Sequence, residues 1–306
     1  MIQSVAIKIY LLIIFAGIAQ NLQAGSAGKN GFPMLKIDVD ARAAAMAGAY
    51  TALAGDALAA YWNPAGLAIA GHRSFIVMHN EWIADIRQEF AAFHFLEGKH
   101  HLAASVNLMT IPDIELRGSV PTPEPQGTTE AFTFAAALSY ARIVNEDWYA
   151  GMSLKYLFEK YYLEKAPGWA IDLGLLKKNL LPRLDWGFTI QNVGRMSQLR
   201  ELRTPLPLMV RNGLAYHYTI KKINRDLVLS TDLQYIHDEA FYFRLGGDLA
   251  LLDYLHVRLG WINGAGDHHF TFGLGLNYAS YHFDYAYVPF DYSLGHSHRF
   301  SLGIQF

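Results

Sequence analysis

Several charged residues stand in an alternating apolar context, where they could form ion pairs or line a water-filled channel. Most of them have apolar residues on both sides, as in the runs Ile-Asp-Leu and Phe-Arg-Leu. Isolated charges are costly in an apolar core, so such residues need water or a partner of opposite charge. We therefore predict that they face a polar lumen; the residues are Asp172, Asp185, Asp232, Arg244, Asp248 and Arg258.

Histidines offer two other kinds of chemistry, catalysis and metal binding. His282 stands two residues before Asp284, so on a strand the pair would point the same way, as a base and its orienting acid do. No nucleophile motif accompanies the pair, and we predict no catalytic residue and no enzymatic activity. Four further histidines show no fixed ligand spacing, so we predict no metal and no cofactor; they are His268, His269, His296 and His298.

Overall composition excludes further classes of protein. The 306 residues carry a formal net charge of −2, whereas nucleic-acid binding needs a clustered basic surface. The chain contains no cysteine, so it has neither a disulfide framework nor a thiolate metal site. We expect no nucleic-acid partner.

Residues 1–24 are typical of a signal peptide. Lys8 precedes an apolar run over residues 9–19, which is too short to cross a bilayer comfortably. Small residues suited to cleavage follow at Ala24 and Ala27. A membrane anchor is the alternative. We predict export to the outer membrane of a Gram-negative-type bacterium.

Alternation with period two is the main pattern from about residue 73 to the C-terminus. In HRFSLGIQF, one face carries Phe300, Leu302, Ile304 and Phe306, and the other carries Ser, Gly and Gln. The chain ends on this apolar face, which we predict to be the C-terminal insertion signal of an outer-membrane protein. Soluble sandwiches also alternate, so the pattern alone does not fix the class.

Strand length and aromatic residues favour a transmembrane barrel. Most segments are long enough to cross a bilayer at a tilt, and Tyr and Trp recur near their ends. Short turns alternate with longer connections, as in bacterial barrels with an even strand count. We predict an all-β fold, a closed antiparallel transmembrane barrel of about 14 strands over residues 73–306. The expected strands lie near 73–80, 87–97, 99–111, 130–142, 146–160, 166–178, 183–193, 205–219, 225–238, 240–252, 254–263, 267–279, 280–288 and 296–306.

Residues 25–72 are rich in Ala and Gly and lack this alternation. A barrel of this size has a lumen wider than its side chains can fill, so we predict that the segment forms a small helical hatch, or plug, inside it. Asp56 can cap a short helix through Tyr61, and Asn63-Pro64 can begin another through Leu67. The corner at Asn63, Pro64, Ala65 and Gly66 is either a gating element or a rigid connector. Arg42 could pair with a carboxylate of the lumen.

This N-terminal segment resembles the PorV/PorQ family, relatives of the FadL-like outer-membrane barrels. The matching elements are Ala41-Arg42-Ala43, Met46-Ala47-Gly48-Ala49, Asp56-Ala57 and Asn63-Pro64-Ala65-Gly66-Leu67. One departure is Ala47, where many relatives are expected to have Gly. The resemblance implies a fourteen-stranded barrel with a hatch folded into its lumen from the periplasmic side.

Two functions follow from the resemblance. The PorV-like one is a role in type IX protein secretion or surface attachment, with secreted cargo or secretion-complex proteins as partners. The FadL-like alternative is a passive channel with a hydrophobic small-molecule ligand. Outer-membrane lipid surrounds the barrel in both cases. The loop over residues 112–129 contains four prolines and is where we expect a protein partner to bind.

Overall fold

The computed structural model describes residues 30–306, except 98, 121, 201–204 and 264–267. The predicted signal peptide over residues 1–24, with Ala24 and Ala27, lies outside the described residues. No helix of the described part is both long and apolar enough to cross a membrane.

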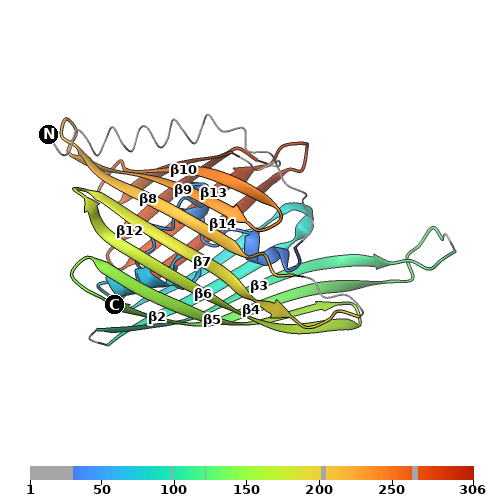
Figure 1. Cartoon of the computed structure of the whole chain (residues 1–306). Helices are drawn as coiled ribbons and strands as arrows, with labels where there is room; N and C mark the ends of the chain where they lie inside the picture. Colours follow the sequence, from blue (N-terminus) through green and yellow to red (C-terminus); the bar gives the residue numbers. More distant parts are fainter. Residues whose placement is uncertain (1–29, 98, 121, 201–204, 264–267) are drawn as a thin grey trace.

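The described chain forms a closed antiparallel barrel of fourteen strands, as the alternation predicts (Figure 1). Each strand pairs with its neighbours in sequence, and β1 closes the barrel by pairing with β14, Ser74 opposite Gln305. We call the end that holds the C-terminus periplasmic and the other end external. The strands are β1 Ser74–Glu81, β2 Arg87–Glu97, β3 His100–Leu116, β4 Gly127–Ile143, β5 Trp148–Tyr161, β6 Glu164–Leu181, β7 Leu184–Met196, β8 Met209–Ile220, β9 Arg225–Ile236, β10 Ala240–Ala250, β11 Leu255–Asn263, β12 Phe270–Tyr278, β13 Tyr281–Pro289 and β14 His296–Gln305.

The two faces of the wall have opposite chemistry. In β14, Ser297, Arg299 and Ser301 point inward and are buried, whereas Phe300 and Leu302 point outward and are 41% and 49% exposed. Lipid cannot hydrogen-bond to backbone groups, so only a closed wall with an apolar exterior is stable there. The exposed apolar side chains are therefore the lipid-facing surface.

The hairpin of β3 and β4 extends well past the strands beside it (Figure 1). Its pairing continues to Leu116 opposite Gly127, whereas β2 leaves β3 at Thr110 and β5 leaves β4 at Ala131. The predicted loop over 112–129 is therefore too long, and the true connection is 117–126. Pro112 does not end the strand because a bulge between Ile111 and Ile114 accommodates it.

Between residue 30, where the described chain begins, and β1, four short helical pieces lie inside the barrel (Figure 1). They are η1 Pro33–Lys36, α2 Ala41–Ala45, α3 Ala59–Trp62 and η2 Pro64–Ile69; a further piece, η3 Ile83–Asp85, belongs to the loop after β1. Helix α2 contacts β11 to β14, and η2 contacts β3 to β6 on the other side of the wall. We call residues 30–70 the plug.

The plug runs through the lumen from end to end. At the external end Gly31 donates to the carbonyl of Pro205, and at the periplasmic end Ala57 donates to the hydroxyl of Ser74. Along the described chain, the plug runs from the external end at Gly31 to the periplasmic end, where it leads into β1.

A charge on the lipid-facing wall should destabilise the barrel. Leu154 lies midway along β5, is 53% exposed and pairs with Leu138 and Ile171. We expect Leu154→Arg to cost about 2–4 kcal/mol of unfolding free energy, because arginine is poorly solvated in lipid. Urea unfolding in lipid vesicles measures this, with Leu154→Met as the control. Equal midpoints for the arginine and methionine variants would contradict a lipid-facing position.

Candidate functional site: the plugged lumen

Side-chain caps set the local structure of the plug. Asp40 accepts a hydrogen bond from the backbone of Ala43 at 3.1 Å and so begins α2. Asp56 accepts from Leu58 at 2.8 Å, but the α-helix itself runs over Ala59–Trp62, later than the predicted Asp56–Tyr61. These caps fold a chain of small residues into short turns rather than one long helix.

The Asn63-Pro64 corner both begins a helix and ties the plug to the wall. The side-chain oxygen of Asn63 accepts from the backbone of Ala65 at 3.2 Å, with Pro64 at the first position of η2. Its amide nitrogen donates to the carbonyl of Thr51 at 2.9 Å and to that of Leu175, in β6, at 3.1 Å. Asn63 therefore joins two plug segments and one strand.

Gly66 completes this corner by allowing a close approach. A Cβ at this position would lie 2.0 Å from the carbonyl oxygen of Ala54, in another part of the plug. Only glycine fits there without moving the backbone. Ala65, beside it, is fully buried.

A belt of inward-facing wall glycines receives the plug. At each of these positions a Cβ would lie between 2.2 and 2.9 Å from a plug atom, closer than real side chains approach. The backbone and the first side-chain atoms of the plug therefore pack directly against the wall backbone. The belt consists of Gly151, Gly174, Gly187, Gly213, Gly246, Gly260 and Gly273.

Two of the predicted lumen charges bind the plug through residues that sequence reasoning missed. Asp232 accepts from the backbone and hydroxyl of Thr51, at 3.1 and 2.5 Å. Arg244 donates to the carboxylate of Asp38 at 2.7 Å and to the carbonyl of Ala47 at 2.9 Å. Thr51 and Asp38 carry no sequence signal, because their partners lie more than 180 residues away.

The third contact joins Arg42 to the wall. Its guanidinium lies 3.4 Å from Asp248, which also accepts from Arg258 at 3.0 Å and contacts His256 at 2.7 Å. Arg258 continues the network to Asp284 at 2.5 Å. The side chain of Arg42 is 34% exposed, so solvent screens this pair and it contributes little stability.

Asp172 and Asp185 bind other residues of the wall. Asp172 lies 2.6 Å from the ammonium of Lys155 and accepts from the backbone of Asn192, where β7 bulges. Asp185 pairs with Lys178 and contacts His217 at 2.9 Å. Both aspartates face inward, as predicted from the alternation.

Aromatic side chains fill the centre of the lumen. Trp62 is fully buried and packs edge-on against Tyr50 and Tyr61, with ring centroids 5.8 and 5.3 Å apart. The guanidinium of Arg211, from β8, lies 4.6 Å from the Trp62 ring centre, a cation–π contact. This contact gives Arg211, which is fully buried, an electrostatic partner.

The pKa values of two plug carboxyls, Asp38 and Asp40, shift in opposite directions because their charged neighbours differ. Burial would raise the pKa of Asp38, but the guanidiniums of Arg244, Arg211 and Arg299 hold it below its usual value. Burial and the nearby Asp284 carboxylate raise the pKa of Asp40 to about 7. Asp38 is thus an anion held among cations, whereas burial and a second carboxylate favour the neutral form of Asp40.

Helix α2 separates two cavities at opposite ends of the lumen. The external cavity, of about 280 Å³, reaches α2 at Ala44. The periplasmic cavity, of about 320 Å³, reaches it at Arg42. The two cavities share no lining residue.

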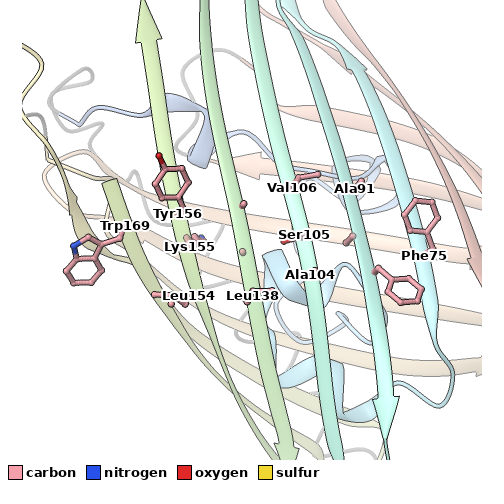
Figure 2. A pocket seen from close by; sticks show the side chains of 14 residues that line it. Phe75, Ala91, Ala104, Ser105, Val106, Leu138, Leu154, Lys155, Tyr156 and Trp169 are labelled. Atoms are coloured by element: carbon pink, nitrogen blue, oxygen red, sulfur yellow. The ribbon is translucent and has the colours of Figure 1, made fainter. Parts of the chain in front are cut away.

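A third hollow lies on the outer wall (Figure 2). Its volume is about 590 Å³, and it crosses β1 to β6 between Phe75 on one side and Leu154, Tyr156 and Trp169 on the other. These side chains belong to the exposed outward set. The hollow is therefore part of the lipid-facing surface and is separate from the lumen.

The histidine chemistry considered from the sequence does not assemble into a site in the described part of the chain. Asp284, beside His282, is bound to Arg258. No group of three or more described His, Cys, Asp or Glu side chains could hold a metal ion.

The fold and its contents define a class: an outer-membrane β-barrel whose lumen holds an N-terminal plug. The family described as "Type IX secretion system protein PorV" matches residues 20–172, half of the chain. The chain belongs to the PorV family, as its N-terminal motif indicates.

Solved structures agree with this fold. The toluene transporter TodX of Pseudomonas putida is 10% identical, with a TM-score of 0.58, over 83% of this chain and 95% of that one. The monoaromatic hydrocarbon channel CymD is 11% identical, with a TM-score of 0.58, over 87% of this chain and 96% of that one. At such identities the likeness shows the FadL-like fold alone. No curated protein sequence matches the chain.

The glycine belt should be necessary for plug docking. Gly246 faces the plug, where an added Cβ would lie 2.8 Å from the Cβ of Met46. At the adjacent Gly247 an added Cβ would lie 3.8 Å from Leu229, an ordinary contact distance. We expect Gly246→Val to loosen the plug, at about 1–3 kcal/mol for the overpacked contact, and Gly247→Val to leave it docked. The chain has no cysteine, so a single Ala60→Cys at a 1% exposed plug position can report docking.

Maleimide labelling of this cysteine in vesicles should be slow in the parent and in Gly247→Val, and faster in Gly246→Val. Equal labelling in all three proteins would show that the plug does not depend on the belt.

The Asp38–Arg244 ion pair should couple the plug to β10. We expect Asp38→Asn and Arg244→Gln each to lower the unfolding free energy by about 3–5 kcal/mol, because each leaves a buried group without its partner. The double variant should lose less than the sum of the two. A double-mutant cycle from urea unfolding measures the coupling, and strict additivity would show that the pair contributes nothing.

Proposed function

We propose that this protein acts in type IX secretion as an outer-membrane component that meets secreted cargo or secretion-complex proteins at its external face. Membership of the PorV family supports the pathway. The observation that carries the mechanism is the filled lumen, since a plug that contacts opposite sides of the wall leaves the external surface as the place for a large partner.

The β3–β4 hairpin is the surface we assign to that partner. It projects beyond the neighbouring strands, and its tip over residues 117–126 carries the exposed Val120, at 71%, and a stiff run of prolines (Figure 1). The projecting part of the hairpin, residues 111–130, is also acidic, with Asp113, Glu115, Glu124 and Glu130 against one cation, Arg117. A stiff, acidic hairpin tip with exposed apolar side chains is better suited to binding a protein surface than to passing a small solute.

We further propose roles for the two ends of the chain. Residues 1–24 would direct export, with cleavage near Ala24 or Ala27. The apolar face of β14, with Phe300, Leu302, Ile304 and the terminal Phe306, would serve as the signal for insertion into the outer membrane. Phe306 is 57% exposed and packs beside Phe93 with ring centroids 6.1 Å apart, so the wall leaves it accessible to an insertion factor.

Passive transport of hydrophobic molecules is the competing function. It needs an apolar path from the external end to the periplasmic end or to an opening in the wall. The cavities at the two ends are instead divided by α2, and the periplasmic one is lined mainly by polar and charged side chains.

Photocrosslinking in cells tests the proposal. A photoreactive residue at Thr122, in the hairpin tip, should capture a secreted protein or a secretion-complex protein, identified by mass spectrometry. The same residue at Tyr254, in the periplasmic turn between β10 and β11 and 56% exposed, is the matched control. Replacement of 112–129 by Asn-Gly should abolish capture and reduce surface delivery of cargo.

A different pair of results would contradict the secretion role. No protein capture from Thr122, together with measurable uptake of a labelled hydrophobic molecule that needs this protein, would overturn the secretion role in favour of transport.

A further inference from the structure

The external cavity combines apolar walls with buried cations. Aromatic and aliphatic side chains from the barrel and its loops form the walls, among them Trp82, Tyr242, Ile262 and Phe290. The plug forms the floor through Lys36, Asp38 and Ala44. Arg244 and Arg299 enter from β10 and β14 and are only 6% and 5% exposed.

The hydrogen bonds of these two arginines are incomplete. Arg244 uses one terminal nitrogen for Asp38 and Ala47, but its Nε is buried with no partner among the described residues. The Nε of Arg299 is likewise buried and unpartnered within the described chain. A buried guanidinium normally donates several hydrogen bonds, since desolvation without them is costly.

The charges around the cavity do not balance. Lys36 pairs with Glu239 at 3.0 Å, and Arg244 pairs with Asp38 at 2.7 Å. Among the described residues Arg299 forms no such ion pair, so the lining carries one cation in excess. Behind it, Arg211 is fully buried, and its three guanidinium nitrogens have no hydrogen-bond partner in the described part.

We propose that this cavity is a binding site for a single small carboxylate, held by Arg299 and Arg244 and packed against the aromatic wall. A carboxylate is planar and accepts the parallel hydrogen bonds that a guanidinium offers. One negative charge balances the excess cation, whereas a dianion would be repelled by Asp38 and Glu239. The site is independent of the secretion role, which concerns the external hairpin.

The cavity also limits the size of the ligand. Its volume of about 280 Å³ and its closure by α2 exclude a long acyl chain that would have to continue through the lumen. A short or aromatic carboxylic acid fits, with its ring beside Trp82, Tyr242 or Phe290. Neutral molecules of the same shape lack the charge that the arginines require.

Fluorine NMR of the full-length protein in non-ionic detergent tests the site, with 4-fluorobenzoate as the probe. We expect saturable binding that excess benzoate reverses and that benzamide, its neutral isostere, does not. Arg299→Gln should weaken binding by about tenfold or more, because a charge-assisted hydrogen bond and the unpaired cation are lost. Arg195→Gln, at an exposed arginine on the outer end of β7, should bind like the parent.

Three results would overturn the proposal: no saturable binding of 4-fluorobenzoate, equal competition by benzamide, or unchanged affinity in Arg299→Gln. The comparison of benzoate with benzamide uses the parent protein alone, so it remains decisive if Arg299→Gln does not fold. Heat-dependent mobility on gels establishes folding of each variant.

The carboxylate could come from a free metabolite or from the end of a protein chain. N-acetylphenylalanine, which carries a chain terminus, and its amide distinguish the two. Tighter binding of N-acetylphenylalanine than of benzoate, lost in the amide, assigns the site to a protein terminus. Tighter binding of benzoate assigns it to a free acid.

Discussion

Lipid offers no hydrogen bonds to a protein backbone, and this constraint determines the rest of the structure. The strands must pair with each other all the way round, so the wall closes, β1 on β14. Closure with fourteen strands creates a lumen that side chains of the wall alone do not fill. The plug supplies the missing interior.

The plug and the wall are complementary in size and in charge. Alanine is the commonest residue of the plug, and the wall presents glycines where plug and wall meet. Around this close contact, a few buried polar links fix the register, notably Asn63 to Leu175, Thr51 to Asp232 and Asp38 to Arg244. Removing one member of such a link leaves the other buried without a partner, which makes the docked arrangement specific.

Much of the barrel could be predicted from local pattern, because period-two alternation records which side of the wall each residue faces. The helix start at Asn63-Pro64 could also be predicted, because a cap depends only on residues close in the sequence. The length of the β3–β4 hairpin could not, because Pro112 reads as a strand breaker and only the bulge after Ile111 lets pairing continue.

Contacts between plug and wall were the least predictable part. Asp38 and Arg244 are separated by 206 residues in the sequence. Several inward carboxylates were possible partners of Arg42, and only the structure identifies Asp248 as its partner. The inward glycines were visible in the alternation as members of the polar face. Their meaning becomes clear only when the plug backbone is seen to rest on them.

The central claim is that the plug blocks the lumen, and ion conductance in planar lipid bilayers tests it most directly. The purified full-length protein should insert without producing a steady ion current, because the plug spans the lumen and divides its end cavities. A stable, ohmic open-pore conductance of the parent protein would contradict the account.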